Sequence, residues 1–298
     1  ATAQSRMTEA PESAEEVTAT WLDTAAATML PEPGMLAQPQ ELAEIDNLPQ
    51  PNEELLAAIP TAAGPVALRE AAATGDPKAL YEIGNRHAEG RGVAEDMAAA
   101  AEWYEKAAEE GLAPAQYRIG NLYEKGVGVE RDIAKAKKWY EMAAAQGNAS
   151  AMHNLAVLHA MGADGITDNE KAARLFTQAA ELGVRDSQFN LGILAAKGVG
   201  VKQDLEEAYK WFAIVAKSGD RDAAAKRDEV ASVLSPDQAE RARATADLWR
   251  AAPLDAEANS VEIPESWSES ADTTAGIDMR QAVRSVQQLL KAGGYDAG

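Results

Sequence analysis

GLAPAQYRIGNLYEKGVGVERDIAKAKKWYEMAAAQ, residues 111–146, is one of four segments that follow the same pattern at a spacing of 36 residues. The other three occupy residues 75–110, 147–182 and 183–218, so the four segments join without a gap. A further glycine, Gly219, begins a fifth unit at the same spacing. Self-similarity at such a period is typical of solenoid proteins, in which each repeat packs only against its neighbours.

Each repeat predicts two helices joined by a glycine turn. Small and branched residues recur at helical spacing in the first helix, where they let a neighbouring helix come close. A glycine then ends this helix, and an aspartate provides an N-cap for the second helix. The aspartates are Asp96, Asp132, Asp168 and Asp204. We predict that the structural core of the repeats contains Trp103, Trp139, Trp211, Gly84, Gly120 and Gly192.

The ordered pattern resembles the Sel1-like repeat, a relative of the tetratricopeptide repeat, over residues 75–218. The resemblance implies an all-α fold, a right-handed α-solenoid of four helix-turn-helix repeats, with a concave face lined by the first helices. Because the ends of a solenoid need polar caps, we expect residues 219–251 to close the stack. In this segment Ser235-Pro236-Asp237-Gln238 predicts a capping box at the start of the last helix.

The composition favours a helical protein and excludes nucleic acid as a partner. Alanine supplies much of the 46% hydrophobic content, whereas aromatic residues make up only 5%. The formal charge of −20 would repel a phosphate backbone. There is no cysteine, and the sequence contains no apolar run long enough to cross a bilayer. Since the sequence begins at Ala1, we expect it to be part of a longer protein.

The flanking segments are predicted to be disordered. Residues 1–64 are rich in proline and acidic residues, with Arg6 as their one basic residue, and predict a tether. Residues 65–73 predict a short helix that leads into the solenoid. Residues 252–278 predict a solvated linker. The last segment, MRQAVRSVQQLLKAGGYDAG at residues 279–298, is similar to the opening helix of the peptidoglycan-binding domain family, so it is interpreted as a truncated start of that domain.

An aromatic column predicts a partner-binding surface. One ring recurs in each first helix, with a second residue four positions later, and tetratricopeptide-like geometry would direct both positions toward the concave face. Such a ladder suits an extended chain, because rings offer apolar faces and asparagine offers donors and acceptors. The alternative is that the rings are packing spacers between helices. The predicted residues are Tyr81, Asn85, Tyr117, Asn121, His153, Val157, Phe189 and Ile193.

Neither catalysis nor metal binding is predicted. The turn of the third repeat differs from the others and carries Asp164, Asp168, Asn169 and Glu170, but it lacks the spacing of a calcium loop, so an altered turn is the simpler interpretation. The three histidines, His87, His153 and His159, lack the arrangement of a metal site, and we interpret them as hydrogen-bonded or solvated. No catalytic motif is present, and we expect no enzyme and no cofactor.

The order of the segments resembles the periplasmic region of the PodJ family of alphaproteobacterial polar localisation proteins. The resemblance implies a periplasmic scaffold at the cell pole that serves polar organelles, pili or adhesion, anchored through an upstream membrane segment. Its expected partners are proteins of the pole or periplasm, and peptidoglycan through the rest of the C-terminal domain. A periplasmic Sel1-repeat regulator that binds and inhibits a sensor kinase remains the alternative.

Overall fold

The computed structural model describes residues 50–163 and 165–268 of the chain. The described helices belong to one compact unit that begins at Pro51. Its elements are helices joined by turns and loops, and no strand occurs within the described residues. The segment at 279–298 and most of the predicted tether lie outside the described residues, as does Asp164.

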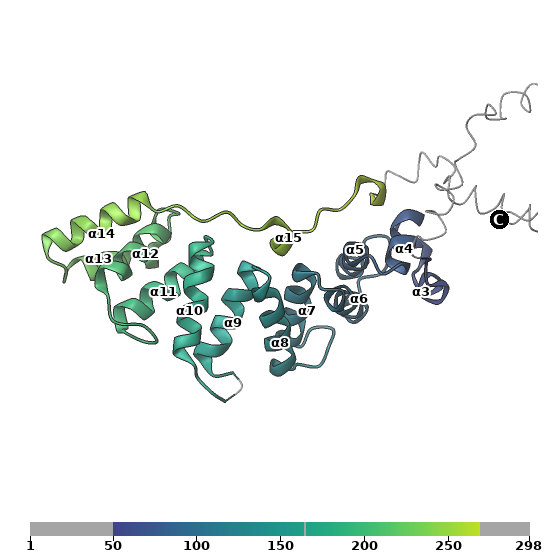
Figure 1. The fold of residues 1–298 in the computed structure, drawn as a ribbon, viewed down its shortest axis with the longest axis horizontal. Coiled ribbons are helices and arrows are strands. Elements are labelled where there is room, and N and C mark those ends of the chain that lie inside the picture. The colour runs from purple at the N-terminus through teal and green to yellow at the C-terminus, as the bar shows by residue number, and fades with distance from the viewer. Residues whose placement is uncertain (1–49, 164, 269–298) are drawn as a thin grey trace, which may run out of the picture. The chain divides into compact units, whose positions relative to one another are not determined.

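The four repeats form four helix pairs that stack in series (Figure 1). Each second helix packs both on the first helix of its own repeat and on the first helix of the next. The all-α solenoid prediction is therefore confirmed. The pairs are α5 (Pro77–Glu89) with α6 (Met97–Glu109), α7 (Ala113–Lys125) with α8 (Ile133–Ala145), α9 (Ala149–Met161) with α10 (Asn169–Glu181), and α11 (Arg185–Lys197) with α12 (Leu205–Ala216).

The turn inside each repeat follows from two residues, a glycine and an aspartate. The glycine that ends each first helix is left-handed, with φ between 62° and 69°, a conformation that glycine adopts at little cost. The aspartate then caps the second helix: one Asp96 carboxylate oxygen accepts from the backbone N–H of Ala98 at 2.9 Å and of Ala99 at 3.0 Å. Asp168 caps α10 in the same way, so the third turn keeps its capping role despite its different sequence.

The glycine column of the first helices has a steric cause. A Cβ atom on Gly84 would lie 2.8 Å from the ring of Tyr104, and one on Gly120 would lie 2.9 Å from the ring of Tyr140. In the fourth repeat, Gly192 faces Phe212 in the same manner. These glycines are therefore close-approach positions, and the approaching group is the second residue of the Trp-Tyr or Trp-Phe pair in the same repeat.

Three short elements cap the N-terminal end of the repeats. The 3₁₀ turn η1 (Thr61–Ala63) and helix α4 (Val66–Ala73) pack on α5, and α3 (Glu53–Ala58) packs on α4. Ile59 and Ala63 are buried in the main core cluster. The predicted tether is therefore wrong for residues 51–63, because these residues bury apolar side chains against the first repeat.

A pair of helices caps the other end of the repeats. They are α13 (Arg221–Ala231) and α14 (Pro236–Leu248), both packed on α12. The predicted capping box is present: Ser235 Oγ accepts from the Gln238 N–H, and Gln238 Oε1 accepts from the Ser235 N–H. Just after α14, the ring of Trp249 meets Trp211 edge-on at a centroid distance of 5.7 Å.

Residues 252–268, here called the C-terminal strap, return along the repeats toward α4 (Figure 1). They contain helix α15 (Ala256–Asn259) and the 3₁₀ turn η2 (Glu265–Trp267). Ala258 and Trp267 are buried, and Trp267 joins the main core cluster. The linker predicted over 252–278 is therefore wrong for residues 252–268. No helix in the described part of the chain is long and apolar enough to cross a membrane.

Candidate functional site

The predicted ring column packs on a second column of rings. Each ring of a first helix meets a ring from the second helix of the same repeat, at centroid distances between 5.4 and 6.1 Å and in tilted or edge-on geometry. Aromatic pairs prefer such arrangements. The four pairs are Tyr81 with Tyr104, Tyr117 with Tyr140, His153 with Phe176, and Phe189 with Phe212.

The column differs in exposure along its length. Tyr81 is only 9% exposed, so it acts mainly as a packing element. Tyr117, His153 and Phe189 are half-buried and keep part of their surface in solvent. The packing interpretation thus holds for the first ring, whereas the partner-binding role of the other three stays a prediction.

Asn85 and Asn121, four positions after the first two rings, lie at the hydroxyls of buried tyrosines. The sequence analysis did not foresee this role. The Tyr104 hydroxyl donates to Asn85 Oδ1 at 2.8 Å. The Tyr140 hydroxyl donates to Glu124 Oε2 at 2.6 Å and accepts from Asn154 Nδ2 at 2.9 Å. Nδ2 of Asn121 lies 3.5 Å from the same hydroxyl. Burial raises the pKa of both tyrosines, so their hydroxyls stay protonated and donate. The signal available in the sequence was the second aromatic residue of each Trp-Tyr pair.

The side chains beside the ring column change from polar to apolar along the repeats. In the second repeat, Arg118 is exposed and its Nε lies 3.4 Å from the Tyr81 hydroxyl. In the third and fourth repeats the equivalents of the asparagines are Val157 and Ile193, which are half-buried and pack against core clusters. An extended partner would therefore meet polar side chains at one end of the column and apolar side chains at the other.

The three histidines have different environments. Nδ1 of His153 lies 2.8 Å from Ser187 Oγ, and burial lowers the pKa of the His153 ring. His87 and His159 are buried, and their Nε2 atoms lack a hydrogen-bond partner among the described residues. The interpretation of these two histidines as hydrogen-bonded or solvated is therefore wrong for Nε2. Within residues 50–163 and 165–268, no group of three potential metal ligands occurs.

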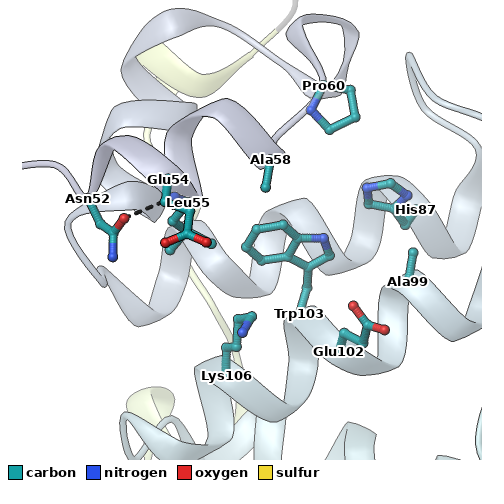
Figure 2. A pocket seen from close by; sticks show the side chains of 10 residues that line it. All are labelled: Asn52, Glu54, Leu55, Ala58, Pro60, His87, Ala99, Glu102, Trp103 and Lys106. Atoms are coloured by element: carbon teal, nitrogen blue, oxygen red, sulfur yellow. Dashed lines mark hydrogen bonds between the residues drawn. The ribbon is translucent and has the colours of Figure 1, made fainter.

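A pocket of about 570 Å³ lies beside the first repeat, between the N-terminal cap and α6 (Figure 2). The ring of Trp103 lies at its centre, below Ala58, and His87 borders it from α5. Glu102 and Lys106 give its rim charges of both signs. This pocket involves none of the ring-column residues, and the sequence analysis missed it because its upper wall comes from residues assigned to the tether.

The repeat pattern matches a known family. The Sel1 repeat is found four times in succession, at residues 77–112, 113–148, 149–184 and 185–220. Residues 77–220 belong to the Sel1 repeat family. The period agrees with that read from the sequence, and the boundaries lie two residues later. Sel1 repeats typically bind proteins, and the fold generally serves as a non-catalytic interaction scaffold.

A solved Sel1 structure resembles this fold. A Sel1 repeat protein from Oxalobacter formigenes is 27% identical with a TM-score of 0.51, and the match covers 71% of this chain and 84% of that protein. A protective antigen of uropathogenic Escherichia coli, c5321, is 25% identical with a TM-score of 0.43, over 62% of this chain and 47% of that one. No curated protein matches the sequence.

Proposed function

We propose that the chain is a periplasmic scaffold for protein–protein interaction at the bacterial cell pole, serving polar organelle, pilus or adhesion development. The observation that carries the binding role is the row of half-buried rings at Tyr117, His153 and Phe189, one in each successive repeat. Partly exposed rings on a rigid helical frame give a partner large contacts at low entropic cost. A partner that crosses the repeats meets one ring per repeat.

The proposed compartment rests on the sequence at the C-terminal end. The similarity of residues 279–298 to the opening helix of peptidoglycan-binding domains supports a location next to the cell wall. The order of tether, repeats and this segment, which resembles the PodJ family, supports the role at the pole. Peptidoglycan would then be bound through the rest of that domain, and the formal charge of −20 agrees with protein partners rather than nucleic acid.

Site-specific crosslinking in the native host tests this function. A photo-reactive amino acid at Tyr117 is compared with the same group at Lys138, an exposed position on α8 outside the ring column. We expect the group at Tyr117 to capture a periplasmic protein of the pole, with little capture from Lys138. Capture of a sensor-kinase domain in a one-to-one complex would favour the regulator instead. Equal capture from both positions would contradict a binding surface at the rings.

A further inference from the structure

The C-terminal strap makes contacts that an ordinary solenoid lacks. Repeats in a solenoid contact only their neighbours, whereas hydrogen bonds of the strap join residues 71 to 181 positions apart. The strap meets three places in turn: the backbone N–H of Ala252 donates to the Glu181 carbonyl at 2.8 Å, α15 lies at the start of α9, and Trp267 reaches the first repeat.

The central contact is a reciprocal pair of asparagines. Asn148 caps α9 through its Oδ1, which accepts from Ala151 N–H, and its Nδ2 donates to the Ala258 carbonyl at 2.6 Å. In return, Asn259 Oδ1 accepts from the Ala149 N–H at 2.9 Å, and its Nδ2 donates to the Gly147 carbonyl at 3.1 Å. The Ala149 N–H is one of the first amides of α9, which have no partner inside the helix.

Only the third repeat can form this contact. An amide side chain has both a donor and an acceptor. Asn148 can therefore cap its helix with its oxygen and, at the same time, bind the strap with its nitrogen. The equivalent N-caps of the other first helices are Asp76, Leu112 and Val184. Aspartate lacks the donor, and the other two lack both groups. Ala258 also lies beside Gly147: a Cβ atom on Gly147 would be 3.8 Å from the Ala258 Cβ, at van der Waals distance.

The far end of the strap is fixed by a buried charge pair. Arg86 and Glu82 are 2% and 3% exposed, and their side chains pair at 2.9 Å. The Trp267 carbonyl accepts a further hydrogen bond from the guanidinium of Arg86 at 2.8 Å. Because buried guanidinium donors need partners, the strap contributes to the satisfaction of this site. The Trp267 ring is 7% exposed and lies in the main core cluster.

We propose that the edge of the solenoid at the turns between successive repeats is a binding site for an extended peptide, and that residues 252–268 of the same chain are its resident ligand. The site recognises a small residue followed by asparagine at α9, and a tryptophan eight residues later at Arg86. The bound strap connects the third and second repeats to the first. It therefore limits how far the repeats can spread, and it fixes the spacing of the ring column.

A cleavable strap tests the proposal in the full chain. A protease site is inserted between Pro253 and Leu254, which are both exposed, and the folded protein is cut and passed over a sizing column. We expect the C-terminal piece to stay with the repeats. Asn259→Ala should release it at least tenfold more readily, whereas Ser260→Ala should not, because the Ser260 hydroxyl bonds only within the strap, to the Ala256 carbonyl.

Hydrogen exchange gives a second measurement on uncut protein. The Ala149 amide should be protected in the unaltered chain and in Ser260→Ala, and should exchange at least tenfold faster in Asn259→Ala. Loss of the piece from the unaltered cut protein, together with rapid exchange at Ala149, would overturn the proposal. Exchange of cut pieces between copies in a stable dimer would also overturn it, since the ligand would then be a second chain.

Discussion

At the scale of single residues, a glycine beneath an aromatic ring sets the distance between the two helices of the first, second and fourth repeats. The backbone of Gly120 passes under Tyr140, a fully buried ring whose hydroxyl is bonded to Glu124 and Asn154. The sequence showed the glycine column but not its partner, because the ring lies 20 residues further along the chain. Only the folded pair brings the two columns together.

Gly120→Ala should therefore destabilise the fold. Alanine favours a helix over glycine by about 1 kcal/mol, but a Cβ atom 2.9 Å from the Tyr140 ring forces a shift that costs about 1–3 kcal/mol. Urea unfolding measures the balance, and Ala134→Gly, at an exposed position of α8, measures the propensity part alone. A gain in stability for Gly120→Ala equal to the loss for Ala134→Gly would show that the ring imposes no constraint.

Two histidines make stability depend on pH. Burial lowers the pKa of His153, and burial with nearby Lys171 and Lys137 lowers the pKa of His159. Below the ordinary histidine pKa of about 6.5, the unfolded chain binds more protons than the folded chain, so the free energy of unfolding falls as pH falls. Above that pH this contribution is fully present.

His153→Phe, which places the residue of the fourth repeat in the third, should reduce this dependence. Urea unfolding at about pH 7.5 and about pH 5.5 should show a smaller loss of stability for the variant than for the unaltered chain. His159 continues to contribute in both proteins, so part of the loss remains. An equal loss in the two proteins would mean that His153 titrates as it does in the unfolded chain.

At the scale of elements, the helix pairs could be predicted and the flanking segments could not. The period of 36 residues places α5 to α12, because every column repeats its chemistry. The helix α3 and the strap occur once each, and their proline and acidic content is typical of linkers. Their burial depends on surfaces that distant residues provide: Arg86 for Trp267, and Asn148 for Ala258. No local pattern encodes such contacts.

The contact between repeats should depend on the tryptophan column. Trp139 lies on α8 in the core cluster that also contains Leu155 and Leu158 of the next repeat. Trp139→Ala should cost roughly 3–5 kcal/mol, because the neighbours in a middle repeat cannot collapse into the space. Met142→Ala, at an exposed site of the same helix, should stay within about 0.5 kcal/mol. Thermal and urea unfolding of both variants decide this; a loss for Trp139→Ala as small as for Met142→Ala would place the interface elsewhere.

At the scale of the whole molecule, the repeats present a row of rings and the strap holds their spacing. The partner-binding site stays a prediction, and the structure narrows its candidates: Tyr81 is buried, and the asparagines are engaged by tyrosine hydroxyls or lie close to them. Sequence alone could not separate packing from binding, because both need an aromatic residue at the same position. Exposure distinguishes them, and it leaves Tyr117, His153 and Phe189 as the binding candidates.

The most direct test of the central claim is the affinity of the partner captured at Tyr117 for the Tyr117→Ala, Phe189→Ala double variant, measured by titration calorimetry beside its melting temperature. We predict a loss of binding of about 2 kcal/mol or more, as for interface hot spots, with a smaller loss of stability than Trp139→Ala causes. Tyr81→Ala, at the buried ring of the same column, should lower stability and leave affinity unchanged. A sharp fall in melting temperature with unchanged affinity in the double variant would contradict the claim.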